Sequence, residues 1–326
     1  MRVTVIGATG HVGTYLVPRL VRAGHDVVSV SRGRREPYRD DGAWEEVESV
    51  TIDREAAEER GEFGAAILET APDAVVDLIC FERESAEALV TALRGEVQQF
   101  LHCGTIWVHG HSDVVPTTED EPRTRRPLGS YGRKKHEIET YLLEEARRNG
   151  FPATVVHPGH IVGPGWAPLN PAGNSDTAVF SRLARGEEVA LPNFGLETVH
   201  HVHADDVAGV FQRAIERWSA AVGESFHAVS PRALTLRGYA EAAAGWFGRE
   251  ANLTFLPFAE WADRPEYDDE AVSQTEEHIR HSPNASMAKA RDLLNHEPRY
   301  SSLEATREAV EALVEAGEVE VGDGHP

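Results

Sequence analysis

Two residues four apart in the middle of the chain, Tyr131 and Lys135, are of types that can move a proton. The residues after them predict a helix, and a spacing of four on a helix places both side chains on one face, one turn apart. A cation beside a phenol favours the phenolate and would bring its pKa of about 10 closer to working pH. The pair is a candidate acid/base site, although the same spacing also arises by chance on solvated helix faces.

A glycine-rich segment at the start of the chain is a second candidate site. Residues 2–6 predict a strand, Gly7, Gly10 and Gly13 follow it, and residues 14–23 predict a helix. In this context the first glycine permits a tight turn, the second lets the backbone approach a pyrophosphate, and the third lets the helix pack closely. A dinucleotide is therefore expected at the helix N-terminus. Three other residues of the loop are expected to line the same site: Thr9, His11 and Val12.

The end of the second predicted strand, residues 26–31, bears on the choice of cofactor. Proteins that bind NAD usually place an acidic residue there for the ribose 2′-hydroxyl. This chain has Ser31 and Arg32 instead, with Arg34 and Arg35 close behind. Because arginine binds phosphate well, NADP is favoured over NAD, although a solvated basic turn would have the same composition.

Further strands and helices alternate through the first half of the chain. Strands are predicted at residues 47–53, 74–80 and 99–105, with helices at 55–70 and 83–94. This order predicts an α/β fold, a Rossmann-type doubly wound parallel sheet that binds ligands at the carboxyl ends of its strands. Those ends carry further candidate site residues: Asp53, placed to meet an adenine, Ile79, Cys80 and Thr105.

Thr105 precedes Tyr131 by 26 residues, and with the glycine segment this resembles the extended short-chain dehydrogenase/reductase family, the NAD(P)-dependent epimerase/dehydratases. The likeness continues at residues 157–165 and 202–208 and so covers most of the chain. It implies that Thr105 hydrogen-bonds the reacting oxygen and that Tyr131 is the acid/base. Lys135 would bind the nicotinamide ribose and lower the pKa of Tyr131. Three more residues are implied to contact the cofactor: His157, Pro158 and His160.

The resemblance also implies how the chain is divided. A Rossmann domain is expected over residues 1–160, with a later contribution from about 199–220. A smaller mixed α/β lobe over residues 161–326 would mainly bind the substrate. The implied activity is hydride transfer at a sugar or nucleotide-sugar hydroxyl or carbonyl, by an epimerase or an oxidoreductase. The alternatives are an NADPH-dependent reductase of a non-nucleotide carbonyl compound and a non-catalytic dinucleotide-binding sensor.

The substrate side departs from the family pattern. Ile106 and Trp107 replace the Asp-Glu pair of the 4,6-dehydratases, which disfavours dehydration. Nucleotide-sugar epimerases usually carry an arginine before the late strand, and residues 197–201 contain none, which weakens a nucleotide-sugar substrate. Other arginines could replace it: Arg182, Arg185 or Arg232. Residues 263–277 are expected to be exposed, with Trp261 and Tyr267 at the edge of the pocket.

A histidine-rich segment, residues 200–203, resembles a metal site because imidazole and the following carboxylates can both ligate zinc. In a strand, however, His201 and His203 share one face while His200 points away. Asp205 is well placed as a helix N-cap. No metal is therefore expected.

The composition limits the partners. Fifty-four acidic residues against 32 basic ones give a net charge of −22, which disfavours nucleic acid and anionic membranes. With only three lysines, we hypothesise adaptation to high salt, the alternative being codon bias towards arginine; full folding and activity without added salt would reject the hypothesis. The chain shows no run of 18 apolar residues and no secretory signal, so a cytoplasmic location is expected. Cys80 and Cys103 are expected to be unpaired, and a homodimer is left open.

Overall fold

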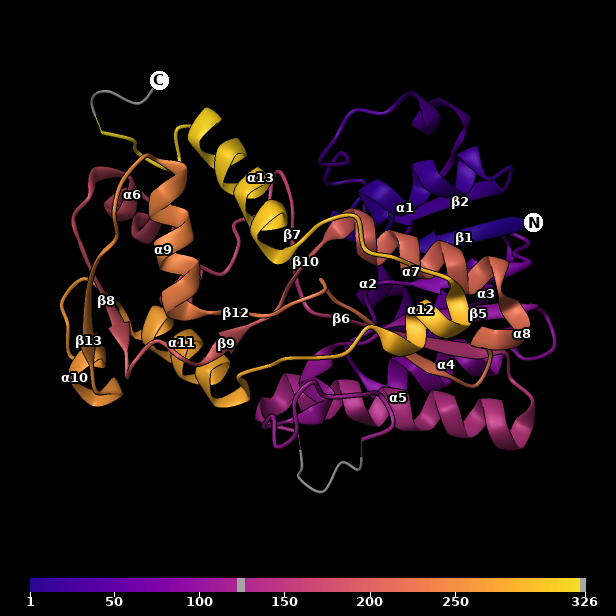
Figure 1. Ribbon diagram of the computed structural model, residues 1–326. Helices are drawn as coiled ribbons and strands as arrows, with labels where there is room; N and C mark the ends of the chain where they lie inside the picture. Colours follow the sequence, from indigo (N-terminus) through magenta and orange to yellow (C-terminus); the bar gives the residue numbers. More distant parts are fainter. Residues whose placement is uncertain (122–126, 323–326) are drawn as a thin grey trace.

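A seven-stranded, entirely parallel sheet forms the centre of the larger lobe in the computed structural model, which describes residues 1–121 and 127–322 (Figure 1). The strand order is β11-β6-β5-β4-β1-β2-β3. From β1 the strand order runs to β2 and β3 on one side and to β4, β5 and β6 on the other. This order is that of a doubly wound Rossmann sheet and confirms the predicted fold class. The strands are β1 (Arg2–Ile6), β2 (Asp26–Ser31), β3 (Glu48–Thr51), β4 (Ala74–Asp77), β5 (Gln99–Cys103), β6 (Ala153–Pro158) and β11 (Ser225–Ala228).

Helices cover both faces of this sheet and bury its apolar side chains. One face packs against α1 (His11–Arg22), α7 (Ala204–Glu216), α8 (Trp218–Ala221) and α12 (Ala288–Leu294). The other packs against α2 (Arg54–Glu59), α3 (Phe63–Leu68), α4 (Arg83–Leu93) and α5 (Gly129–Asn149). Strands covered on both faces read as continuous apolar runs, which is why residues 74–80 could be recognised as a central strand.

Four predicted elements are divided or shorter than the sequence suggested. The strand expected at 74–80 ends at Asp77, whose carboxylate accepts from the backbone N–H of Ile79. The helix expected at 55–70 is divided into α2 and α3 at Gly61, whose φ of 71° is incompatible with a continuous helix. The strands expected at 47–53 and 99–105 are shortened because their last residues cap the following elements. Asp53 caps α2, and Thr105 caps the 3₁₀ helix η2 (Ile106–His109).

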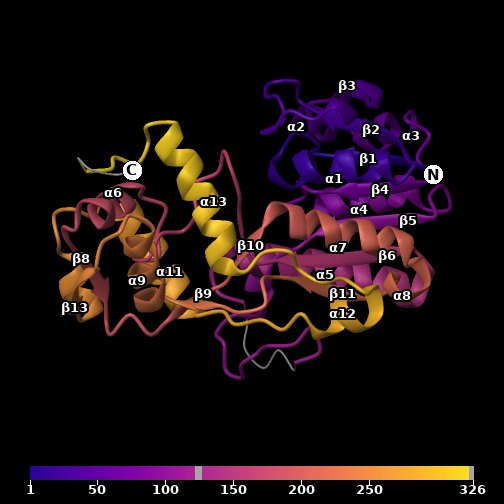
Figure 2. The same ribbon diagram turned by 45° about the horizontal axis from the view of Figure 1, so that its top comes forward.

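The smaller lobe has its own apolar core, and it lies beside the carboxyl edge of the sheet (Figure 2). Its strands form two-stranded sheets: β8 (Glu188–Pro192) with β13 (Asn252–Leu256), and β9 (Thr198–Val199) with β12 (Leu234–Thr235). Strands β7 (His160–Val162) and β10 (His201–His203) pair between the lobes. The helices of the lobe are α6 (Ala178–Arg185), α9 (Leu236–Trp246), α10 (Phe258–Ala262), α11 (Asp269–His281) and α13 (Ser302–Glu315). A short 3₁₀ helix, η1 (Gly42–Glu46), precedes β3.

The two lobes interleave in sequence more than expected. Beyond the anticipated segment at 199–220, β11 forms the seventh strand of the large sheet, and α12 packs beside it. In both views α7, α8 and α12 lie with the larger lobe (Figures 1 and 2), and Figure 2 shows β11 there as well. The chain therefore crosses between the lobes several times.

Two local expectations were wrong. Trp261 and Tyr267 do not edge a pocket: they are 0% and 6% exposed and stack on each other in the core of the smaller lobe, with ring centroids 4.2 Å apart. Asp205 does not cap α7. The N-cap is His203, whose Nδ1 accepts from the Asp205 backbone N–H, because the Asp205 carboxylate is engaged by Arg19 and Arg299.

Cys80 and Cys103 are unpaired, as expected. Within residues 1–121 and 127–322, none of the helices combines the length and apolar character needed to span a bilayer.

Candidate active site

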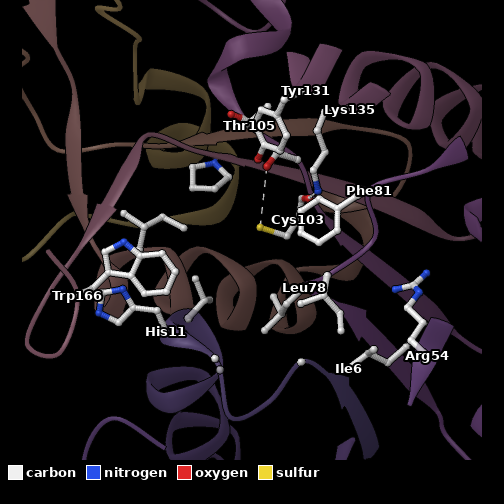
Figure 3. A pocket seen from close by; sticks show the side chains of 18 of the residues that line it. Ile6, His11, Arg54, Leu78, Phe81, Cys103, Thr105, Tyr131, Lys135 and Trp166 are labelled. Atoms are coloured by element: carbon white, nitrogen blue, oxygen red, sulfur yellow. Dashed lines mark hydrogen bonds between the residues drawn. The ribbon is translucent and has the colours of Figure 1, made fainter. Parts of the chain in front are cut away.

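A cavity of about 1160 Å³ lies outside the carboxyl ends of the large sheet, where the strand order reverses between β1 and β4 (Figure 3). This is the position at which open α/β sheets bind ligands. The larger lobe contributes the glycine loop and the ends of its strands, and the smaller lobe contributes the opposite wall. The volume exceeds that usual for one drug-sized ligand and leaves room for a dinucleotide with a second molecule.

The glycine loop fits a pyrophosphate. Gly7 has a φ of 84°, and a Cβ at Gly13 would lie 2.1 Å from the carbonyl oxygen of Ala8, so neither position tolerates a side chain. Gly10 is the N-cap of α1 and provides no side-chain cap, which leaves the first backbone N–H groups of the helix available to an anion. The loop lies along the cavity. These residues therefore fit the dinucleotide that the sequence predicted.

Most of the predicted cofactor residues line this cavity, and two do not. The cavity is lined by Gly7, Thr9, Gly10, His11, Val12, Gly13, Ser31, Arg32, Asp53, Ile79, Tyr131, Lys135, Pro158 and His160. Cys80 is buried and contributes only its carbonyl oxygen, to Lys135. His157 is fully buried behind Thr105, where Gly104 packs directly against its ring.

Arginines gather at the end of the cavity beyond β2. Arg32 is exposed and makes no hydrogen bond or ion pair with the residues that the structure describes. Arg34 pairs loosely with Asp53 at 3.4 Å, while Arg35 donates to the hydroxyl of Tyr38. Arg32 is therefore the guanidinium that is available to a ligand here.

The three candidate catalytic residues converge on the cavity from β5 and α5. Thr105 follows β5, and its hydroxyl accepts from the backbone N–H of Trp107, which fixes its orientation. Tyr131 and Lys135 lie one turn apart on α5, as predicted, and Figure 3 shows Thr105 and Tyr131 side by side. The Lys135 ammonium donates to the carbonyl oxygens of Cys80 and Cys103, both at 2.7 Å, and lies 6.0 Å from the centre of the Tyr131 ring.

The pKa of Tyr131 is opposite to the expectation. Although Tyr131 is 40% exposed to the cavity, the protein around its phenol desolvates the hydroxyl and raises this pKa well above its ordinary value; Cys103 adds to the rise, and a hydrogen bond with Thr105 lowers it. Lys135 is almost fully buried, and burial lowers its own pKa. The cation does not lower the pKa of Tyr131 here because it is held by two carbonyls rather than by the phenol, so desolvation prevails. Tyr131 is therefore protonated at neutral pH.

Two buried residues behind Thr105, His157 and Glu139, form a hydrogen-bonded dyad that positions Thr105 and was not predicted from the sequence. The Thr105 backbone N–H donates to Nδ1 of His157 at 3.0 Å. Because Nδ1 accepts, Nε2 carries the proton and donates to the Glu139 carboxylate at 2.9 Å. Glu139 lies on α5, one turn after Lys135, so the dyad ties the end of β5 to the helix that carries Tyr131. Pairing on the sheet brings residues far apart in sequence together here, and no local pattern indicates it.

We expect His157→Leu to lower kcat by about 10- to 100-fold with little change in KM, because Thr105 loses the acceptor that holds it and small misplacements of reacting groups are costly. His157→Gln is the matched control, since its amide can accept from Thr105 and donate to Glu139, and it should retain kcat within a few fold. Steady-state kinetics of both variants provide the measurement. Equal losses in the two variants, or a change confined to KM, would contradict the positioning role.

The wall opposite the glycine loop comes largely from residues that sequence reasoning missed. Trp166 lies on the loop after β7 and stacks on His11, with ring centroids 5.0 Å apart. Three further residues of this wall lie within about one helical turn on α11: Gln274, Glu277 and His278. Their i, i+3, i+4 spacing was a signal that this helix presents one polar face to a site.

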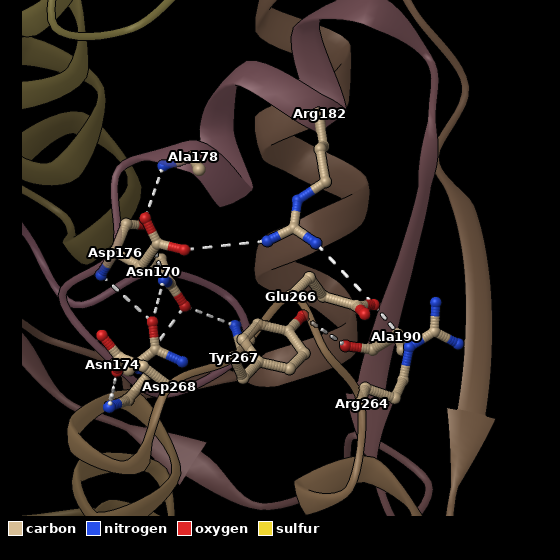
Figure 4. A network of polar contacts seen from close by, with 12 residues as sticks. Asn170, Asn174, Asp176, Ala178, Arg182, Ala190, Arg264, Glu266, Tyr267 and Asp268 are labelled. Carbon is tan, nitrogen blue, oxygen red and sulfur yellow. Dashed lines mark hydrogen bonds and ion pairs between the residues drawn. The ribbon is translucent and has the colours of Figure 1, made fainter.

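The loop at residues 166–175 is held in place by buried amides (Figure 4). Asn170 and Asn174 are fully buried; Asn170 donates to the carbonyl oxygen of Asp176 at 2.9 Å, and Asn174 donates to the Thr275 hydroxyl on α11 at 3.0 Å. In the same view Arg182 points to Asp176 and Glu266, at 3.7 and 3.9 Å. The loop is therefore anchored to α11.

None of the arginines suggested as replacements for the missing phosphate ligand lines the cavity. Arg182 is engaged as described, Arg185 pairs with Glu187 and Glu320, and Arg232 lies outside the cavity wall.

The histidines at residues 200–203 bind protein backbone atoms rather than one another. His200 bonds the carbonyl of Ser230, and His201 that of Leu169. Among the described residues, the set whose ligand atoms come together is Asp77, Cys80 and His102, with ligand atoms within 4.8 Å of one another. Positive charge already fills that region, because Arg54 donates to Asp77 at 2.8 Å and the Lys135 ammonium is bound to the Cys80 carbonyl. This charge opposes a bound cation.

The fold, the glycine loop and the placement of Tyr131 define a dinucleotide-binding enzyme of the short-chain dehydrogenase/reductase type. The sequence profile of the NAD dependent epimerase/dehydratase family matches residues 3–228. The chain belongs to this family of epimerases and dehydratases.

Relatives of this chain differ in what they do. It is 27% identical to the 2′-dehydrokanamycin reductase of Streptomyces kanamyceticus over 275 residues, which is 84% of this chain and 74% of the relative. It is also 27% identical to a UDP-glucose 4-epimerase of Mycolicibacterium smegmatis, over 79% of this chain and 86% of the relative. A chloroplast stem-loop binding protein of Arabidopsis thaliana is 25% identical over 74% of this chain, which spans 62% of that relative.

Solved structures agree on the fold. The UDP-glucose 4-epimerase of Thermotoga maritima, in a structure with UDP-glucose, superposes with a TM-score of 0.72 at 22% identity, covering 97% of this chain and 99% of the other. At this identity the likeness concerns the fold alone.

Proposed function

We propose that this protein transfers hydride between a nicotinamide dinucleotide and a sugar hydroxyl or carbonyl, with Thr105, Tyr131 and Lys135 as its catalytic set. The observation that carries the proposal is that these three residues and the glycine loop face one cavity at the reversal point of the sheet. The family membership adds support, because its activity uses NAD. An RNA-binding role is disfavoured by the net charge of −22.

Thr105 and Tyr131 would act on the substrate directly. The Thr105 hydroxyl and the Tyr131 phenol hold the reacting oxygen of the substrate between them. In the reductive direction the phenol gives its proton to that oxygen, and in the oxidative direction the phenolate takes it back. The raised pKa of Tyr131 keeps the phenol protonated at neutral pH, which is the form that reduction needs.

Other residues would hold the cofactor. The open N-terminus of α1 would bind the pyrophosphate, and Lys135 would bind the nicotinamide ribose. When bound, the nicotinamide ring supplies the hydride chemistry.

Deuterium transfer tests the proposal. Purified protein would be incubated with NADPH and with NADH, each deuterated at C4, and with a panel of keto sugars and nucleotide keto sugars. Deuterium in a product, detected by mass spectrometry, is the expected result. Net oxidation of an exchangeable cofactor identifies a reductase, whereas a sugar isomer formed by protein carrying tightly bound NAD identifies an epimerase. Failure to bind either dinucleotide would overturn the proposal.

The preference for NADP rests on Arg32 and is part of the proposal. A guanidinium without a partner is available for a 2′-phosphate, and no acidic residue ends β2. We expect Arg32→Ala to raise KM for NADPH by about 10- to 100-fold, since a charge-assisted hydrogen bond contributes roughly 1.5–3 kcal/mol. KM for NADH should remain within about twofold. Arg60→Ala, which removes an exposed arginine paired with Glu62, is the control. Equal effects on both cofactors would reject the role of Arg32.

A further inference from the structure

The positively charged side chains of the described cavity wall all lie on the part that would face the cofactor, which also carries Asp53, Glu55, Glu58 and Glu82. Cationic residues among the described lining are Arg32, Arg34, Arg35, Arg54 and Lys135, and all of them lie in the larger lobe. Arg54 is held by Asp77, and Lys135 by two carbonyls. The described lining residues of the smaller lobe include no lysine or arginine. A substrate diphosphate would find no cation among these described residues.

The carboxylate on that wall is Glu277 of α11. Its Oε1 lies 2.5 Å from where a Cβ on Gly129 would sit, which places it against the start of the helix that carries Tyr131, two residues further on. The carboxylate makes no hydrogen bond or ion pair with the described residues; burial raises its pKa, and the charge of the nearby Arg280 lowers it in part. A partly buried carboxylate that accepts no hydrogen bond is costly, and a cationic ligand bound directly to it would relieve that cost.

A structural role for Glu277 is the simpler alternative, because carboxylates stabilise helix N-termini. A carboxylate serving that purpose accepts from the first backbone N–H groups of the helix. In the described structure no N–H of α5 donates to Glu277, and α5 has no side-chain cap. The position therefore favours a ligand over a cap.

The neighbouring histidines complete a neutral, polar wall. Burial lowers the pKa of His278 to about 4 and that of His160 far below its usual range, so neither is charged at pH 7. Nδ1 of His160 accepts from the His200 backbone, which leaves its Nε2–H as a donor with no partner among the described residues. Trp107 adds an aromatic face beside both rings. Such a wall binds hydroxyls, and it offers no positive charge to a phosphate.

We propose that the substrate is a polyhydroxylated compound bearing a protonated amine, an amino sugar or aminocyclitol, whose ammonium binds Glu277 while its reacting oxygen lies at Thr105 and Tyr131. The class differs from a nucleotide sugar by the sign of its charge. The overall charge of −22 acts in the same direction, since it attracts cations and repels a diphosphate. This proposal rests on the proposed function, because it assigns the substrate of the same site.

Binding to the cofactor-loaded protein tests the proposal, with glucosamine, N-acetylglucosamine, glucose and UDP-glucose as probes. N-acetylation removes the charge of the amine, so the first two form a matched pair. We expect glucosamine to bind about tenfold more tightly than N-acetylglucosamine or glucose, and more tightly than UDP-glucose. Dissociation constants would be measured by calorimetry or by ligand-observed NMR at pH 7.

Glu277→Gln should remove the preference for glucosamine and leave the affinity for glucose unchanged. Glu276→Gln is the control, because Glu276 is adjacent, pairs with Arg280 and lies outside the cavity lining. Equal binding of glucosamine and glucose, tighter binding of UDP-glucose, or a preference that survives in Glu277→Gln would overturn the proposal.

Cofactor binding is measured separately in each variant. A protein that binds NADPH and transfers deuterium but shows no amine preference contradicts the amine proposal alone. A protein that binds no dinucleotide contradicts the proposed function.

Discussion

Tyr131→Phe is expected to lower kcat by about 10²- to 10⁴-fold, the range that a positioned acid/base contributes. The substitution removes one hydroxyl from a side chain that is open to the cavity, so the fold should be unaffected. Affinity for NADPH should also be unchanged, because the phenol acts on the substrate oxygen. The measurement is the rate of deuterium transfer to a substrate identified from the sugar panel, together with the melting temperature.

Tyr141→Phe provides the matched control, because Tyr141 lies on the same helix and its ring contacts Arg83 outside the cavity. It should leave kcat within about twofold. If Tyr131→Phe and Tyr141→Phe turn over the substrate at the same rate as the unaltered protein, Tyr131 is not the acid/base.

The pH dependence follows from the direction of the pKa shift. Since burial raises the pKa of Tyr131 above its usual value of about 10, the phenol stays protonated through neutral and mildly alkaline pH. Reduction needs the protonated form, so its rate should show no fall between pH 7 and about pH 9 due to this group. Oxidation needs the phenolate and should rise with pH over the same interval. A reductive rate that decreases as the pH is raised from 7 to 9, in parallel with ionisation of Tyr131, would contradict the assignment.

The sequence allowed the fold and the cofactor side of the site to be predicted because their signals are local. Gly7, Gly10 and Gly13 follow a short strand within a few residues, and the spacing of four on a helix determines the geometry of Tyr131 and Lys135. Such patterns depend on backbone conformation and helical period, which short stretches specify.

The substrate wall could not be predicted in the same way. Glu277 reaches the start of α5 from almost 150 residues later, and His157 reaches Thr105 through pairing on the sheet. These contacts arise from the way β6 aligns beside β5 and α11 packs against the cavity, and no single stretch encodes them.

The pKa of Tyr131 was mispredicted for a related reason. Spacing on a helix shows which groups are close, whereas the pKa depends on burial and on what each group binds. The distance to Lys135 could be foreseen, but the carbonyls of Cys80 and Cys103 that hold the ammonium could not.

Lys135→Met should lower kcat by about 10²-fold or more, and it distinguishes a functional ammonium from a structural one. Lys135 joins the carboxyl ends of β4 and β5 beneath the cavity, through carbonyl oxygens of Cys80 and Cys103. Its removal leaves the proposed ribose site without a donor and lets Tyr131 and the strand ends shift, and displacements of about 1 Å can cost 10²-fold. Methionine fills a similar volume, so the folded state should persist.

Lys134→Met is the control for Lys135→Met, because Lys134 is the adjacent residue, is exposed and pairs with Glu82 at the surface. It should retain kcat within about twofold. Cofactor affinity separates the two roles of Lys135: if it binds the ribose, KM for NADPH rises in Lys135→Met by about tenfold or more, as the loss of a charge-assisted hydrogen bond requires. If it only joins the strands, the melting temperature falls while KM for NADPH is unchanged. Unaltered kcat and KM in Lys135→Met would remove Lys135 from the catalytic set altogether.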